Sequence, residues 1–183
     1  AAQMLYNLLL DKEVPVTVRF RDVPETAWYK TAVDTLASLG IVNGTGNHTF
    51  MPERPITRAE FTAIAMRFAK QDTRGESIFS DVPKTVWYYN DVIGSTQYGW
   101  VNGYSDGTFR PNNTITRAEV ATIVNRMLGR SADESYVDQH TAELTQFSDV
   151  GKSFWGYYDI MEAANAHDHQ KIDQVENWTA LTA

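Results

Sequence analysis

The chain has 183 residues, and its 43% hydrophobic and 12% aromatic content can fill a folded core, which argues against wholesale disorder. The formal net charge is −7 and the Lys and Arg residues form no cluster, so nucleic acid is a poor candidate partner. The absence of cysteine excludes disulfide scaffolds and thiolate metal sites, and no apolar run reaches the roughly eighteen residues of a membrane span.

Residues 1–19 open the chain with an apolar stripe. Ala1, Met4, Leu5 and Leu8 lie at helical spacing, which predicts an amphipathic helix over 1–10. The segment matches the helix that follows T-R-A-E in the repeats described next. We therefore expect it to be the terminal helix of an earlier repeat, and the chain to be a piece of a longer protein.

A long internal repeat follows, in two full copies at 20–78 and 79–130. Residues 20–70 and 79–129 align without a gap, each residue matching the one 59 positions later. The shared positions are Phe20/Phe79, Asp22/Asp81, Trp28/Trp87, Gly44/Gly103, Phe50/Phe109, Pro52/Pro111, Thr57/Thr116, Arg58/Arg117 and Glu60/Glu119.

Each full copy predicts a short helix, a turn-rich loop and a longer helix. The first helix covers about 26–39 and ends at Gly40, which suits a left-handed residue after a helix. The longer helices are predicted at 58–70 and 117–129. Because the apolar stripes of 1–10, 58–70 and 117–129 are equivalent, we expect a mainly α fold in which they form a pseudo-threefold three-helix bundle with three short-helix and loop prongs.

The last part of the chain departs from the repeat. Residues 131–146 are acidic and predict a linker with one or two helical turns. A partial third copy starts at 147, where Phe147, Asp149, Val150 and Trp155 repeat the opening pattern. It has no T-R-A-E, and 147–183 is therefore predicted to be a divergent partial repeat followed by a tail.

The T-R-A-E sequence has a structural and a functional interpretation. Thr57 with Glu60, and Thr116 with Glu119, fit a capping box in which each side chain bonds the other residue's backbone amide. Arg58 and Arg117 are less easily explained, because a cation in the first turn opposes the helix dipole. They either form an ion pair with Asp22 or Asp81, stack on an aromatic ring, or make an anion site beside free helix amides.

The repeated aromatic residues also have two interpretations. Trp28, Trp87 and Trp155 each open a short helix, where they either pack in the core or form a platform for a sugar ring. Tyr104 lies in a Gly/Asn/Asp-rich loop and is a better candidate for ligand contact than for the core. Its counterpart is Thr45, so the two loops are not equivalent.

The string F-S-D-V-P…W-Y…G-Y-S-D-G-T-F-R-P-N-N-T-I-T-R-A-E closely resembles the S-layer homology domain. This resemblance covers nearly the whole chain apart from the acidic insertion and the tail. It implies a non-catalytic module on the bacterial cell wall, in the extracellular S-layer. Such modules bind secondary cell-wall polymers attached to peptidoglycan, and their usual ligand is a pyruvylated amino sugar held in grooves between repeats.

The resemblance also implies roles for individual residues. Arg58 and Arg117 would hold the pyruvate carboxylate, and the rest of the implied pocket comprises Thr57, Glu60, Thr116, Glu119, Trp87, Trp155, Gly44, Gly103 and Tyr104. No cofactor, metal or catalytic residue is implied. The partner would be the wall glycan, with no nucleic acid and no membrane insertion.

Three alternatives stay open. A wall-glycan hydrolase would need paired carboxylates, but Glu60 and Glu119 lie in separate repeats and fit capping. A metal-dependent module would use Asn102, Asp106 or the His167-Asp168-His169 group, although a turn and a solvated tail are the expected roles. A scaffold would instead bind another surface protein or a second copy of the chain.

Overall fold

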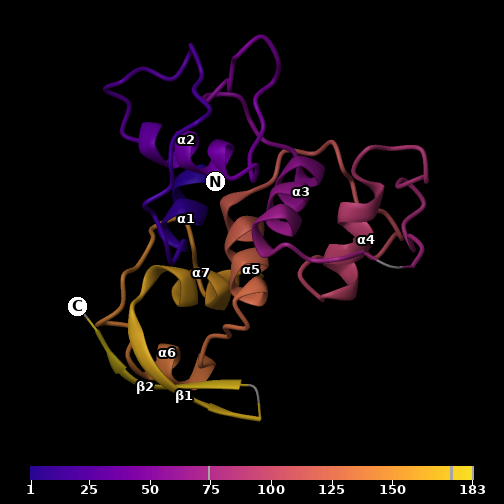
Figure 1. The fold of residues 1–183 in the computed structure, drawn as a ribbon. Coiled ribbons are helices and arrows are strands. Elements are labelled where there is room, and N and C mark those ends of the chain that lie inside the picture. The colour runs from indigo at the N-terminus through magenta and orange to yellow at the C-terminus, as the bar shows by residue number, and fades with distance from the viewer. Residues whose placement is uncertain (74, 174, 183) are drawn as a thin grey trace. The chain divides into compact units, whose positions relative to one another are not determined.

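The computed structural model describes residues 1–73, 75–173 and 175–182. The chain forms two compact units, the first comprising 1–94 with 103–114 and the second comprising 95–102 with the chain from 115 onward. The described part is mainly helical, as predicted (Figure 1). In chain order its elements are α1 (Ala2–Asn7), α2 (Lys30–Ser38), α3 (Arg58–Ala69), α4 (Tyr89–Gln97), α5 (Arg117–Met127), α6 (Glu134–Gln139), α7 (Tyr157–Ala164), β1 (His167–Ile172) and β2 (Val175–Leu181).

The predicted N-terminal helix is present as α1, which is shorter than expected and packs against α2. Leu5 of the predicted stripe is fully buried. Helix α2 begins later than predicted because the residues around Trp28 form tight turns, in which Ala27 N donates to the Pro24 carbonyl and Lys30 N to that of Ala27. Its end agrees with the prediction, since Gly40 has a φ of +72°.

The loop between the two helices of each repeat is held by the aspartate of F-x-D. The Asp22 carboxylate accepts hydrogen bonds from Phe50 N at 2.8 Å and Met51 N at 2.7 Å. Asp81 does the same for Phe109 N and Arg110 N, both at 2.8 Å. The repeated aspartates therefore fix the loop conformation, which explains why both copies carry them.

The loop glycines Gly44 and Gly103 are required by close packing. A Cβ atom on Gly103 would lie 2.1 Å from Cε1 of Phe79, and one on Gly44 would lie 2.5 Å from Cε1 of Phe20. Such distances leave no space for a side chain. The F of F-x-D thus packs directly against the loop backbone, and the glycines are conserved between the copies for this reason.

The second unit contains a hydrophobic cluster that the sequence does not predict. It comprises Val137, Leu144, Tyr157, Met161 and Trp178. The segment 131–146 contains α6, whose six residues agree with the one or two helical turns predicted there, and it contributes two of these buried side chains. Helix α7 packs against α5, where Asp159 accepts hydrogen bonds from the side chains of Thr122 at 2.7 Å and Asn125.

The end of the chain is a β-hairpin and not the predicted solvated tail. Strands β1 and β2 pair antiparallel, with an irregularity between Asp168 and His169. Glu176 and Trp178 are two residues apart on β2, so they lie on one face of the hairpin, and both are buried. Figure 1 shows the hairpin beside α6.

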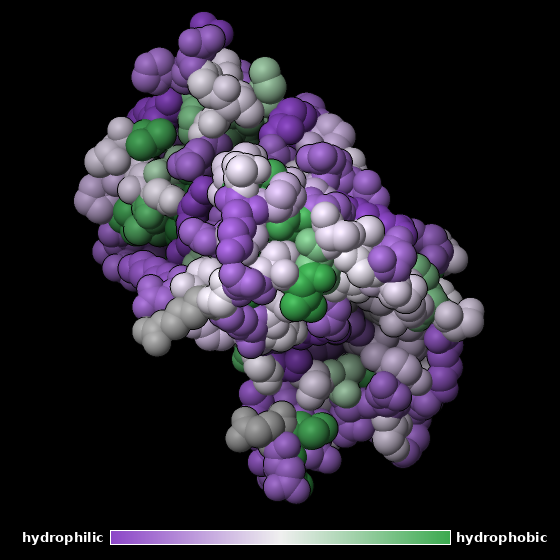
Figure 2. Space-filling model, turned by 90° about the vertical axis from the view of Figure 1, so that its right-hand side faces the viewer, coloured by the Kyte–Doolittle hydropathy of each residue, from purple (hydrophilic) through white to green (hydrophobic). Residues whose placement is uncertain are grey.

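Hydrophilic residues cover much of the face drawn in Figure 2, where apolar residues form separate patches. Within the described residues, every helix is too short or too polar to span a bilayer.

Candidate functional site

The capping interpretation of T-R-A-E is confirmed for both threonines and both glutamates. Thr57 Oγ1 accepts from Glu60 N at 3.2 Å, and Glu60 Oε2 accepts from Thr57 N at 2.9 Å. Thr116 and Glu119 make the same pair of bonds at the start of α5. Burial alone would raise the pKa of the Glu60 carboxyl, but hydrogen bonds from Arg54 and from Thr57 outweigh this and lower it.

Arg58 is buried in the first unit, with 6% of its surface exposed. Its Nε donates to the Phe109 carbonyl oxygen at 2.9 Å. The guanidinium carbon lies 4.8 Å from the centre of the Phe109 ring and 5.0 Å from that of Tyr104. Of the explanations weighed above, stacking on aromatic rings is therefore confirmed for Arg58, and the rings belong to the loop of the following repeat.

The first helix amides beside Arg58 are also in use. Arg58 N donates to the Asn113 carbonyl at 2.9 Å and Ala59 N to the Pro111 carbonyl at 3.0 Å, while Thr57 and Thr114 form a β-bridge. The first amides of α3 are therefore not free, because the loop of the second repeat covers the start of this helix.

Arg117 occupies the equivalent position in the second unit but has a different environment. It is exposed, and among the described residues its backbone amide and that of Ala118 have no acceptor. The partial third copy has no G-Y-S-D-G-T-F-R-P loop to cover them. Gly156, at the start of α7, lies beside the Ala118 side chain. The predicted arrangement of an Arg beside free helix amides is therefore present at Arg117.

The repeated tryptophans are on the surface. Trp28, Trp87 and Trp155 are 77%, 62% and 63% exposed, so the core interpretation is wrong for all three. Trp28 and Trp87 each stand edge-on to the tyrosine that follows them, with interplanar angles of 82° and 85°. An exposed indole held at a fixed angle can stack on a flat apolar face of a ligand.

Tyr104 lies close to two guanidinium groups. Besides Arg58, the guanidinium of Arg110 lies 3.8 Å from the centre of its ring. Arg110 is itself paired with Asp106 at 2.9 Å, which helps to lower the pKa of the Asp106 carboxyl to about 2, after the larger effect of the Thr108 hydroxyl hydrogen bond. This packing gives Tyr104 a structural role in the loop.

A pocket of about 550 Å³ lies in the first unit. Two of the exposed indoles, Trp28 and Trp87, border it, as do Gly44 and Glu60 of the predicted site. Its remaining lining includes Ala1, Ala2, Gln3, Tyr29, Val33, Val42, Asn43, Thr45, Phe50, Met51, Pro52, Arg54, Ile56, Ala63, Ile64 and Arg67. The pocket thus joins aromatic surface to polar side chains, as small-molecule binding sites generally do.

Arg67 is the cation of this pocket that the sequence analysis missed. Arg54 pairs with Glu60, whereas the Arg67 side chain makes no hydrogen bond or ion pair with any residue that the structure describes. Burial raises the pKa of the Asp91 carboxyl, and the charge of Arg67 opposes part of this shift. A signal was present, since Arg126 is the repeat equivalent of Arg67.

Comparison with known families identifies the repeats. The profile of the S-layer homology domain matches residues 19–62 and 78–121. The chain carries tandem S-layer homology domains. Both matches run from the F-x-D motif through the loop into the T-R-A-E helix, so they contain the loop and cap contacts described above.

Relatives of these S-layer homology domains occur in much longer proteins. Cell surface glycoprotein 1 of Acetivibrio thermocellus is 30% identical over 88% of this chain, and the cellulosome-anchoring protein of the same organism is 30% identical over 86%. Amylopullulanase of Thermoanaerobacterium thermosulfurigenes is 35% identical over 71%. The chain spans 7%, 35% and 7% of their respective lengths.

Proposed function

We propose that these S-layer homology domains anchor their parent protein to the bacterial cell wall by binding an acidic wall polysaccharide, without catalysing a reaction. The cell surface is their location. The ligand we propose is the pyruvylated amino sugar of a secondary cell-wall polymer. The observation that carries the proposal is the pocket in the first unit, which is lined both by two exposed indoles and by the Arg67 guanidinium.

The chemistry of the pocket suits this ligand. A sugar ring offers flat apolar C–H faces to Trp28 and Trp87. A pyruvyl carboxylate matches the planar donor fork of Arg67, which can make two parallel hydrogen bonds. Asn43 and Thr45 line the same pocket and offer polar groups for sugar hydroxyls. Glu60 is bound to the cap and to Arg54, so it is not available as a general acid or base.

Titration calorimetry with a pyruvylated wall-polymer fragment tests the carboxylate contact. We expect Arg67→Gln to weaken binding about tenfold or more, because a charge-assisted hydrogen bond contributes about 1.5–3 kcal/mol. The matched control is Arg126→Gln, its repeat equivalent, which does not line this pocket. The same fragment without its pyruvyl group should bind the wild type and Arg67→Gln equally.

Two results would contradict the proposal. Saturable binding that Arg67→Gln leaves unchanged would exclude this pocket and favour the exposed Arg117 end of α5. No wild-type binding, together with capture of another surface protein, would favour the alternative function as a protein scaffold.

We also propose that α1, α3 and α5 form the pseudo-threefold bundle predicted from their equivalent apolar stripes. Leu5 and Phe61 are fully buried and Val120 is buried, as such a bundle requires of each helix. Spin labels at Asn7, Arg67 and Arg126, which are equivalent along the repeats, should give three similar pairwise distances by pulsed electron paramagnetic resonance. Three clearly unequal distances would exclude the bundle.

A further inference from the structure

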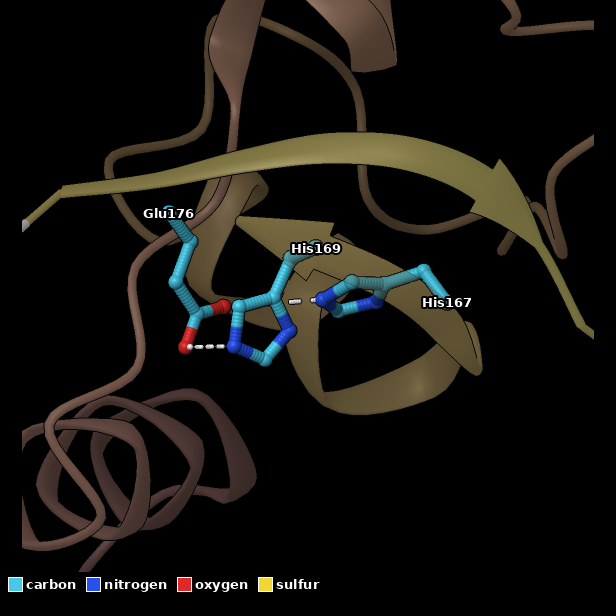
Figure 3. A group of neighbouring side chains, drawn as sticks. All are labelled: His167, His169 and Glu176. Atoms are coloured by element: carbon cyan, nitrogen blue, oxygen red, sulfur yellow. Dashed lines mark ion pairs between the residues drawn. The ribbon is translucent and has the colours of Figure 1, made fainter. Parts of the chain in front are cut away.

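The inner face of the C-terminal hairpin carries two histidines and a glutamate whose donor atoms converge. His167 and His169 lie on β1 and Glu176 lies on β2 (Figure 3). Their ligand atoms all lie within 4.8 Å of one another. His167 Nε2 is 3.5 Å from Glu176 Oε2, and His169 Nε2 is 3.4 Å from Glu176 Oε1. These distances are too long for good hydrogen bonds.

The Nε2 atom of His167 faces the group as an acceptor. The His167 side chain is fully buried, and its Nδ1 lies 2.9 Å from the Asn165 carbonyl oxygen. A carbonyl only accepts, so Nδ1 carries a proton, and in the neutral ring Nε2 then carries a lone pair. In that form the lone pair faces carboxylate oxygens of Glu162 and Glu176, 3.6 Å and 3.5 Å away, and either a bound cation or a proton on Nε2 would relieve their repulsion.

Glu176 is the member of the group whose charge is least compensated by hydrogen bonds. Its side chain is fully buried, and within the described residues neither oxygen has a hydrogen-bond donor. A buried carboxylate without partners is costly. The nearest cation, the Lys171 ammonium, is 3.6 Å from Oε1 and donates instead to the Gly129 carbonyl at 2.6 Å.

Glu162 is already compensated. Its Oε1 lies 2.7 Å from a guanidinium nitrogen of Arg130, at an angle that does not make a hydrogen bond, and its Oε2 accepts from Trp178 Nε1 at 3.2 Å. The side chains that remain as possible metal ligands are therefore two imidazoles and one carboxylate.

We propose that His167, His169 and Glu176 bind a divalent transition-metal ion of the Zn²⁺ class. Two imidazole nitrogens and one carboxylate oxygen are a known three-ligand set for Zn²⁺, which leaves a fourth position for water. Zn²⁺ sits about 2.0–2.2 Å from such ligands, and a tetrahedral site then has ligand atoms about 3.3 Å apart. The distances from His167 and His169 to Glu176, 3.5 Å and 3.4 Å, are already close to that separation, so side-chain rotations alone would bring the three ligands around one ion. Ca²⁺ and Mg²⁺ prefer all-oxygen sites and fit poorly.

The surroundings hold the first ligand in place. The Asn165 carbonyl fixes the His167 tautomer, and the Trp178 ring stacks on His167 with centres 3.7 Å apart and an interplanar angle of 14°. A hydrogen bond to the second imidazole nitrogen is the usual support of a metal-binding histidine. The ion would join both strands of the hairpin. His169 pairs across the hairpin with Trp178, which belongs to the hydrophobic cluster.

Calorimetric titration of ZnCl₂ into the untagged chain, first freed of metal by a chelator, tests the site. We expect one equivalent of Zn²⁺ to bind and to raise the unfolding midpoint, since a ligand of the native state stabilises it. His169→Gln should weaken Zn²⁺ binding about tenfold or more and abolish the midpoint shift. This side chain is 34% exposed, so its replacement should leave the fold intact. Glu176→Gln, which keeps the shape of the side chain, should remove binding as well.

His48→Gln is the matched control, because His48 is exposed in the first unit and lies outside the group. It should bind Zn²⁺ as the wild type does, and Ca²⁺ or Mg²⁺ should give no saturable heat. The proposal is overturned if Zn²⁺ fails to bind up to millimolar concentration, in which case a proton held between His167 and the carboxylates explains the group. Equal affinity in His169→Gln and the wild type would overturn it too.

Discussion

Replacing Arg58 with alanine is expected to lower the free energy of unfolding by about 2–3 kcal/mol, because the buried guanidinium binds the Phe109 carbonyl and packs on two rings. Arg117→Ala should change it by less than about 0.5 kcal/mol, since Arg117 is exposed. Urea denaturation followed by tryptophan fluorescence measures both values. Although the two arginines are equivalent in sequence, the loop that covers one is missing at the other.

Equal effects of the two substitutions would contradict the structural role of Arg58. The distinction also decides how binding experiments are read. Loss of glycan binding in an Arg58 variant would report on loop disorder as readily as on a lost carboxylate contact, whereas a folded Arg117 variant reports on ligand contact alone.

Replacing Trp28 and Trp87 together with alanine is expected to weaken binding of the wall-polymer fragment about thirtyfold or more. Buried aromatic anchors at binding sites often contribute at least about 2 kcal/mol, and these two indoles border the same pocket. Their high exposure means that little packing is lost, so the unfolding midpoint should stay close to that of the wild type.

The control for the tryptophan variant is Ile78→Ala, which removes an apolar side chain that is 75% exposed and does not line the pocket. It should bind the fragment like the wild type in the same calorimetric titration. A tryptophan double variant that keeps full affinity would remove the indoles from the site and leave the pocket without its main apolar surface.

The helices and their caps could be predicted from the sequence because their signals are local. The apolar spacing predicted the bounds of α3 and α5 to within two residues of those observed, and T-x-x-E predicted both capping boxes. The same residues could not reveal that Arg58 is covered, because Phe109, whose carbonyl it binds, is 51 residues away in the loop of the next copy. Nor could spacing tell that Trp28 and Trp87 are exposed, since an aromatic residue before a helix suits a core as well as a platform.

The C-terminal region was predicted least well. Its hairpin has few β-branched residues in β1, and the run H-D-H-Q-K is typical of a solvated tail. The strand β2 is instead held by Trp178, which packs in the hydrophobic cluster with residues of α6 and α7, and Glu176 is buried on the same face of the strand. The sequence identified His167 and His169 as possible metal ligands, but a single buried glutamate on the opposite strand follows no periodic pattern, so Glu176 could be added only from the structure.

The contacts of Arg58 imply that the packed structural unit does not begin and end where the sequence repeat does. The start of α3 is completed by the loop at 103–114, so one cooperative module combines the end of one copy with the middle of the next. A gene fusion cut at the border between copies would separate Arg58 from Phe109 and expose both. Excision or grafting of such an array should therefore place its boundaries after the loop that follows each T-R-A-E helix.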